Sequence, residues 1–298
     1  MIGSARTVRI ALAFATVYLV WGSTYLAIRI GVSDAPAILF AGARFLIAAP
    51  IMLAYAWFRG AQLPRSRRDW LIIVATALLM LVGANGLVTW SEQWVDSNQA
   101  ALIVATSALW MAWFGTWGAR GERLPKLTIA GLLIGFAGVA VLVGVGVKLH
   151  QAPLSAYAAL LLSPVLWAGG SVVSRRYPTT STPLMTAALQ MLVTGVVMTT
   201  LGLLNGDLAR WHPTPSALGA LIYLAVLGSC VAYGAYYWLV HEVTPAQLGT
   251  YAYVNPAVAV VLGWLVLGEA LHPTQMLGTA IVLGSVILVT VASRRSRR

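Results

Sequence analysis

The sequence predicts an all-α membrane protein of ten transmembrane helices, arranged as two inverted five-helix repeats with both termini in the cytoplasm. Three observations predict this fold: long apolar stretches, a one-sided distribution of positive charge, and landmark residues that recur at a nearly constant spacing. Of the 298 residues, 59% are hydrophobic and only 9% are charged. Soluble domains carry about 25% charged residues, so the composition alone indicates a protein of the bilayer.

Each expected span is a stretch of about 20 mostly apolar residues, the length that crosses a bilayer as a helix. The segments between the stretches are short, and the longest of them, 59–69 and 205–215, have eleven residues each. Any function must therefore reside within the helix bundle. In chain order, the expected spans are 8–30, 37–58, 70–91, 98–118, 127–147, 154–174, 183–204, 216–240, 246–267 and 275–293.

The positive charges give these spans a direction. With a cytoplasmic N-terminus, 15 of the 19 Lys and Arg residues fall in cytoplasmic segments, Lys148 and Arg210 face outward, and Arg29 and Arg44 lie within spans. Short loops rich in Lys and Arg stay in the cytoplasm. Topology and attraction to anionic lipid then account for the net charge of +11. The basic loops are too short to form a nucleic-acid-binding module, so no nucleic acid partner is expected.

Landmark residues of the first half recur in the second. The offset is 147 residues between Gly121-Glu122-Arg123-Leu124 and Gly268-Glu269-Ala270-Leu271, 146 between Trp21 and Trp167, and 148 between Trp90 and Trp238. Each half, 8–147 and 154–293, then holds five spans, and an odd number of spans inverts the second copy. Inverted repeats around a site near the bilayer midplane are typical of secondary transporters.

Several of these landmarks also carry a family resemblance. The chain resembles the EamA-type exporters of the drug/metabolite transporter superfamily, in particular the YddG- and YedA-like members, over essentially its whole length. The resemblance implies two EamA domains in a basket-shaped inner-membrane (plasma-membrane) transporter that exports amino acids or related metabolites, with aromatic amino acids associated with YddG-type members. The matching segments are Trp21-Gly22-Ser23-Thr24-Tyr25, Ala41-Gly42-Ala43-Arg44-Phe45, Tyr251-Ala252-Tyr253-Val254-Asn255-Pro256 and the two Gly-Glu pairs.

Polar side chains within the spans mark a candidate substrate pathway, because a polar group facing lipid is costly. In the ninth span, Gln247, Tyr251 and Asn255 share one helical face, and Pro256 follows directly. A proline frees a backbone carbonyl one turn earlier, and broken helices at the midplane bind substrate in such transporters. The alternative is that these groups hydrogen-bond to a neighbouring helix.

Similar stripes predict a neutral, aromatic-rich cavity built from spans 1, 3, 4, 6, 8 and 9, with spans 5 and 10 as outer supports. Such a cavity suits an apolar or aromatic body with polar ends. For each tryptophan taken singly, core packing explains its position equally well. The residues expected to bind substrate are Trp21, Asn85, Gln99, Trp110, Trp167, Tyr233, Tyr237, Gln247, Tyr251 and Asn255.

Ionisable groups constrain the mechanism. All eight acids lie in loops or at span edges, whereas proton-coupled pumps place a carboxylate or histidine deep in the bundle. Facilitated diffusion and proton antiport therefore both stay open. Arg44, about two turns inside a span, either recognises a carboxylate, pairs structurally with Glu92 or Asp34, or extends its charged end toward the membrane surface.

Other functional classes lack their sequence signatures. The four histidines are scattered, so no metal site is expected, and no catalytic motif or cofactor-binding loop is found, so the chain is not expected to be an enzyme. A channel would show rings of like residues or a repeated filter. The expected partners are a small-molecule substrate and membrane lipid. Export of another metabolite or drug is the alternative function, and Gly131 and Gly135 leave a dimer interface or packing within one chain open.

The predicted topology can be tested by cysteine labelling. In a Cys230→Ala background, Ser66→Cys lies on a cytoplasmic loop and Lys148→Cys on an outer loop. We expect an impermeant maleimide to label only the position-148 variant in intact cells, and the position-66 variant only after the membrane is opened. Labelling of both from outside intact cells would contradict the ten-span topology.

Overall fold

The computed structural model describes residues 2–95, 97–118, 121, 123–143, 152–258 and 273–295, and this part of the chain is helical, without strands. Six helical stretches are long and apolar enough to cross a membrane. They coincide with the first, second, third, sixth, seventh and eighth expected spans. Their bounds are Ala5–Asp34, Ala37–Phe58, Arg67–Ser91, Leu154–Arg176, Pro183–Leu204 and Pro215–Glu242.

The first half contains α1 (Ile2–Asp34), α2 (Ala37–Phe58), α3 (Arg67–Ala77), the π-helix η1 (Leu78–Asn85), α4 (Gly86–Ser91), α5 (Ser97–Val104), α6 (Ser107–Gly115) and α7 (Lys126–Val143). The second contains α8 (Leu154–Arg176), α9 (Pro183–Leu204), the 3-10 helix η2 (Asp207–Arg210), α10 (Pro215–Tyr223), the π-helix η3 (Leu224–Tyr233), α11 (Gly234–Glu242), α12 (Pro245–Gly249) and α14 (Pro273–Arg295). Residues 251–258 are also helical.

The four remaining expected spans correspond to shorter helical segments. Three are apolar helices over Ala100–Gly115, Lys126–Val141 and Met276–Ala292. The ninth span begins with α12 and the helix at 251–258, and its remainder, 259–267, lies outside the described residues. The repeated segment that begins at Gly268 lies outside them as well.

Local sequence sets where several helices begin and end. Three helices start at a Thr-Pro pair, in which the threonine hydroxyl accepts a hydrogen bond from a first-turn amide and the proline occupies the first turn. The helices α2 and α9 both end before a glycine with a φ of 73°, Gly60 and Gly206. A side chain rarely adopts that conformation, which reverses the chain at the helix end.

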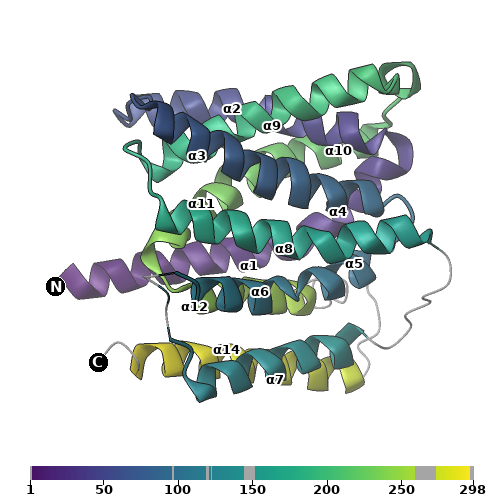
Figure 1. Ribbon diagram of the computed structural model, residues 1–298. Coiled ribbons are helices and arrows are strands. Elements are labelled where there is room, and N and C mark those ends of the chain that lie inside the picture. Colours follow the sequence, from purple (N-terminus) through teal and green to yellow (C-terminus); the bar gives the residue numbers. More distant parts are fainter. Residues whose placement is uncertain are drawn as a thin grey trace.

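The main helix contacts recur when the two halves are exchanged. The α2–α9 and α7–α14 pairs make the most extensive contacts, and they lie at opposite ends of the helix stack in Figure 1. Between them, α1 packs on η3 and α11, while its counterpart α8 packs on η1 and α4. In the same view, α1 and α8 run in opposite directions.

The two π-helices also occupy corresponding positions. The start of η3 at Leu224 follows that of η1 at Leu78 by 146 residues, and the two ends, at Tyr233 and Asn85, differ by 148. A π segment inside an α-helix costs regular hydrogen bonding and occurs frequently at functional sites. Both segments lie in the middle of the helix layers and carry residues that line the cavity described below.

Close approach of α7 and α14 depends on glycines. A Cβ at Gly131 would lie 2.8 Å from Val289, and one at Gly138 would lie 2.8 Å from Ile281. At Gly135 it would lie 2.6 Å from both the Tyr253 ring and the Ser285 hydroxyl. These glycines therefore serve packing within one chain, which accounts for the small-residue spacing without a dimer.

Two glycine substitutions on this helix pair give a matched test. Gly135→Ala places a methyl group against the Tyr253 ring, and overpacking of this kind typically costs about 1–3 kcal/mol. Gly284→Ala meets nothing within 4 Å and gains helix propensity of up to about 1 kcal/mol. We expect thermal unfolding of the purified protein to show a lower midpoint for the first variant only. Equal midpoints would contradict the proposed packing role.

Candidate functional site

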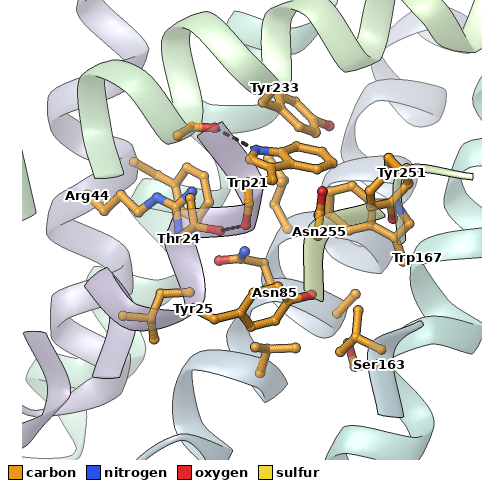
Figure 2. Close-up of a pocket in the computed structure, with 17 residues that line it drawn as sticks. Trp21, Thr24, Tyr25, Arg44, Asn85, Ser163, Trp167, Tyr233, Tyr251 and Asn255 are labelled. Carbon is orange, nitrogen blue, oxygen red and sulfur yellow. Dashed lines mark hydrogen bonds between the residues drawn. The ribbon is translucent and has the colours of Figure 1, made fainter. Parts of the chain in front are cut away.

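A cavity of about 70 Å³ lies at the centre of the helix layers, between segments from both halves of the chain. That volume holds a few water molecules, so binding of a larger molecule requires the surrounding helices to move apart. Figure 2 shows the side chains that converge on it from several helices. It is lined by Trp21, Thr24, Tyr25, Ile28, Arg44, Phe45, Leu81, Ala84, Asn85, Val88, Val104, Ser163, Trp167, Gly228, Tyr233, Tyr251 and Asn255.

One side of the cavity is an aromatic cluster centred on Trp21. Its ring meets Trp167 edge-on at 5.5 Å between centroids, Tyr251 edge-on at 5.2 Å, and Tyr236 at 5.0 Å. Tyr233 packs against Trp167 at 6.1 Å. Such edge-to-face pairs orient one another, so the cluster presents a preformed aromatic surface to whatever enters the cavity.

Four members of the aromatic cluster, Trp21, Trp167, Tyr233 and Tyr236, have hydrogen-bond partners within the protein. Trp21 Nε1 donates to the Gly228 carbonyl at 3.0 Å, and Trp167 Nε1 donates to the Tyr236 hydroxyl at 2.9 Å. Tyr233 donates to Gln190 Oε1 at 2.6 Å. Since a buried donor without an acceptor costs about 1–3 kcal/mol, these bonds fix the rings and leave their apolar surfaces for contact.

Two asparagine side chains at the cavity, in contrast, do not complete their hydrogen bonding. The Oδ1 atoms of Asn85 and Asn255 are buried and have no hydrogen-bond partner. Both residues line the cavity, Asn85 from the end of η1 and Asn255 from the helix at 251–258. Figure 2 shows their amides pointing toward the space beneath Trp21. Buried acceptors left unpaired are rare in native proteins, and these two belong to residues that line the cavity.

Arg44 brings a positive charge to the same cavity. Its side chain is 5% exposed, its Nε donates to Ser229 Oγ at 2.9 Å, and its guanidinium lies 5.0 Å from the centre of the Phe45 ring. The structural pairs considered for it do not form. Asp34 Oδ2 accepts from Thr214 instead, and the Glu92 carboxylate oxygens have no hydrogen-bond partner.

The burial of Glu92 differs from the expectation that no acid lies deep in the bundle. It follows α4 at the edge of the third span, as expected, yet it is fully buried. Arg29 donates through Nη1 to its backbone carbonyl. Burial raises the pKa of the Glu92 carboxyl well above its usual range, while the nearby charge of Arg29 lowers it. A position at a span edge therefore did not mean access to water, because α8 and α1 both pack on α4.

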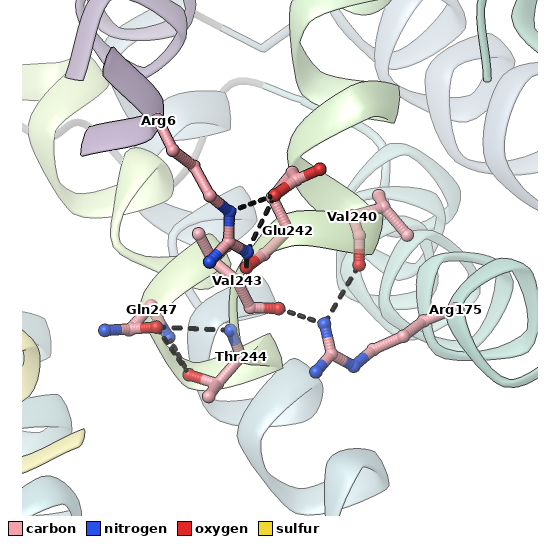
Figure 3. Close-up of polar contacts among 7 residues, drawn as sticks. All are labelled: Arg6, Arg175, Val240, Glu242, Val243, Thr244 and Gln247. Atoms are coloured by element: carbon pink, nitrogen blue, oxygen red, sulfur yellow. Dashed lines mark hydrogen bonds and ion pairs between the residues drawn. The ribbon is translucent and has the colours of Figure 1, made fainter. Parts of the chain in front are cut away.

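The arginine landmarks Arg29 and Arg175 make equivalent contacts in the two halves. Just as Arg29 donates to a carbonyl beyond the end of α4, Arg175 donates through Nη1 to the carbonyls of Val240 and Val243 at the end of α11, as Figure 3 shows. The last carbonyls of a helix have no partner within it, and a cation there also opposes the negative end of the helix dipole. Each arginine thus joins the first helix of its half to the third.

The structure brings six of the ten predicted binding residues to the cavity: Trp21, Asn85, Trp167, Tyr233, Tyr251 and Asn255. Tyr237 is buried beside Tyr233, at 6.0 Å between ring centres, and does not line the cavity. Trp110 packs against Trp113 and Phe114 along α6. The side chain of Gln99 lies outside the described residues.

Gln247 caps a helix instead of lining the cavity. Its side chain accepts through Oε1 from the backbone N–H of Thr244 at 3.2 Å, and its backbone N–H donates to Thr244 Oγ1 at 3.1 Å. This is a reciprocal capping box, visible in Figure 3. The helix is interrupted at Thr250, so the i, i+4 face predicted through Gln247, Tyr251 and Asn255 is not continuous. Pro256 lies within the regular helix at 251–258, six residues beyond the interruption.

Sequence reasoning missed Tyr236, which contacts three members of the aromatic cluster. Its ring lies 5.0 Å from Trp21, 5.3 Å from Trp167 and 5.4 Å from Tyr251, and it is fully buried. The predicted set includes Tyr233 and Tyr237, which are four residues apart. Tyr236 lies three residues after Tyr233, a spacing that also places two side chains on one helical face.

Comparison with known proteins agrees with this architecture. The model of the EamA-like transporter family matches residues 8–144 and 154–291. The uncharacterized inner membrane transporter YedA of Escherichia coli K12 is 38% identical over 94% of this chain and 90% of its own length. The uncharacterized transporter YvbV of Bacillus subtilis is 25% identical over 97% of this chain and 94% of its own. A solved crystal structure with 24% identity superposes with a TM-score of 0.80, covering 96% of this chain and 99% of that one.

The hydroxyl of Tyr236 provides a test of the aromatic cluster. Tyr236→Phe removes the acceptor of Trp167 Nε1 and the partner of Ser171 Oγ, which lies 2.7 Å from it. We expect a loss of about 1–3 kcal/mol in the free energy of unfolding, measured by denaturation in detergent. Tyr55→Phe, at a tyrosine with 52% exposure, serves as the control and should leave it unchanged. Unchanged stability of both variants would show that the hydroxyl does not hold the cluster.

Proposed function

The chain belongs to the EamA-like transporter family, and from this premise we propose that it is a secondary transporter of the inner membrane that exports amino acids, with a preference for aromatic or large apolar ones. Membership makes it a membrane transporter and not an enzyme. The preference rests on one observation: a central cavity that combines an oriented aromatic surface with unpaired buried amide oxygens.

We propose the ten-span topology with both termini in the cytoplasm as the frame for transport. Several observations support two inverted repeats, 8–147 and 154–293. The main helix contacts recur when the halves are exchanged, both π-helices recur at an offset of 146 to 148 residues, and Arg29 and Arg175 make equivalent contacts. In such proteins the substrate binds between the repeats, and rocking of one repeat against the other exposes the site to each face in turn.

The chemistry of the cavity supports an amino acid as the substrate. Its aromatic cluster offers contact area to a flat apolar side chain, since aromatic pairs contribute about 0.5–1.5 kcal/mol beyond burial of area. The Oδ1 atoms of Asn85 and Asn255 can accept hydrogen bonds from an ammonium group. Lining residues come from α1, α2, η1, α4, α5, α8, η3 and the helix at 251–258, so the site is shared by both halves as alternating access requires.

A flux experiment in reconstituted vesicles tests this function. We expect labelled phenylalanine or tryptophan to show saturable uptake and counterflow, with weaker competition from alanine and glycine. A linear, non-saturating flux would identify a channel instead. Absence of counterflow for all twenty amino acids, with protein correctly inserted, would favour export of another small metabolite or drug through the same cavity.

Two classes of variant separate recognition of the substrate's side chain from recognition of the groups that all amino acids share. Trp167→Ala or Trp21→Ala removes aromatic contact and should weaken transport of phenylalanine several-fold more than that of a small amino acid. Asn255→Leu should reduce transport of all accepted amino acids together, because it removes a contact to a group that they share. Equal losses for large and small substrates in both classes, at normal expression, would mean that these residues serve folding.

A further inference from the structure

We propose that Arg44 is the anchor for a carboxylate group of the transported molecule, a role that rests on the transport function proposed above. The binding site would then have a defined polarity, with the carboxylate at Arg44 on α2 and the donor groups of the substrate at the asparagine oxygens. Sequence analysis left this arginine open between ligand recognition and a structural ion pair.

The position of Arg44 gives it access to the cavity from a helix that otherwise packs mainly against α9. A Cβ added to Gly228 would lie 3.2 Å from Arg44 Nη2, so the absence of a side chain at Gly228 leaves room for the guanidinium. The same glycine accepts the Trp21 Nε1 hydrogen bond through its carbonyl. Gly228 thus places the charged group and the central tryptophan of the aromatic cluster next to each other.

The hydrogen bonding of Arg44 is incomplete. Only Nε has a partner, Ser229 Oγ, and no described residue accepts from Nη1 or Nη2 or forms an ion pair with the guanidinium. Arginine stays protonated in proteins and offers five donors in a planar fork. A buried charge without a partner costs several kcal/mol. The remaining donors therefore need water or an anion within the cavity.

The remaining polar atoms of the cavity complement this charge. In Figure 2, Arg44 lies on one side of Trp21, and Asn255, Tyr251 and Trp167 lie on the other. The unpaired oxygens of Asn85 and Asn255 accept hydrogen bonds, whereas the free Nη groups donate them. No described acid lines the cavity. Its surface is therefore built to bind an anion at one end and a donor at the other, with aromatic contact between them.

The geometry favours a carboxylate over a larger anion. The two Nη groups of one guanidinium match the two oxygens of a carboxylate in a bidentate pair. Arg44 is the single Lys or Arg residue that lines the cavity among the described residues, so a doubly charged group such as a phosphate would be only half neutralised there. The substrate class that follows is a monocarboxylate, either with an ammonium group or without one.

The test compares phenylalanine with two relatives that each lack one charged group: phenylalaninamide has no carboxylate, and 3-phenylpropionate has no ammonium group. Phenylalanine, phenylalaninamide and 3-phenylpropionate are each used to compete with labelled phenylalanine in counterflow by wild-type vesicles. Losing a hydrogen-bonded ion pair typically costs about 1.5–3 kcal/mol, which is a ten-fold to hundred-fold loss of affinity. We expect phenylalaninamide to compete at least ten-fold more weakly than phenylalanine.

Arg44→Gln should remove this discrimination. Phenylalanine should then compete as weakly as phenylalaninamide, whereas the affinity for phenylalaninamide should stay nearly unchanged. Ser229→Ala is the matched control, since it removes the structural partner of Nε and leaves the charge, and it should keep the preference for the carboxylate. A preserved preference in folded Arg44→Gln protein would overturn the proposal.

Failure of this proposal and failure of the proposed function give different results. If phenylalanine is transported and its amide competes equally well in the wild type, the anchor is wrong and amino-acid export stands, even where Arg44→Gln does not fold. If no amino acid is transported but labelled 3-phenylpropionate binds the wild type and not the Arg44→Gln protein, the anchor stands and amino-acid export is wrong.

Discussion

Hydrogen bonding in an apolar solvent is the constraint on which the rest of this structure depends. Lipid cannot pair with a backbone amide or a polar side chain, so each such group inside the bilayer must find its partner within the protein. The helices satisfy most of the backbone. Where helices end inside the protein, long side chains take over, as Arg29 does at the end of α4 and Arg175 does at the end of α11.

Because of the same constraint, polar groups without a hydrogen-bond partner help to locate the site. Trp21, Trp167 and Tyr233 all complete their hydrogen bonds against neighbouring helices, so the protein can satisfy polar atoms in this region. Arg44 nevertheless has donors without a partner, and the Oδ1 atoms of Asn85 and Asn255 lack donors. All three residues line one cavity. We propose that a bound molecule completes the hydrogen bonding at these positions.

The packing of the bundle places that site at its centre. Glycines let α2 approach α9 and α7 approach α14, as where a Cβ at Gly42 would lie 2.5 Å from Thr199. Lipid offers little hydrophobic drive for helix association, so close van der Waals contact of this kind holds membrane helices together. The helices between these two pairs enclose the cavity together with α2, and the π-helices η1 and η3 carry Asn85 and Tyr233, which line it.

The sequence by itself determined the membrane class, the position of the six long helices, the family, and most of the aromatic cavity. These properties follow from composition, segment length and residue spacing, which the bilayer constrains strongly. Only the tertiary structure decided which polar residues share the cavity. A helix interruption at Thr250 turned Gln247 into a cap, a neighbouring helix buried Glu92, and Tyr236 joined the cluster from an unexpected face. Spacing along one helix defines a face only while that helix is regular. The side that faces a cavity depends on helices distant in the sequence, as with Arg44, whose surroundings are set by Gly228 and Ser229.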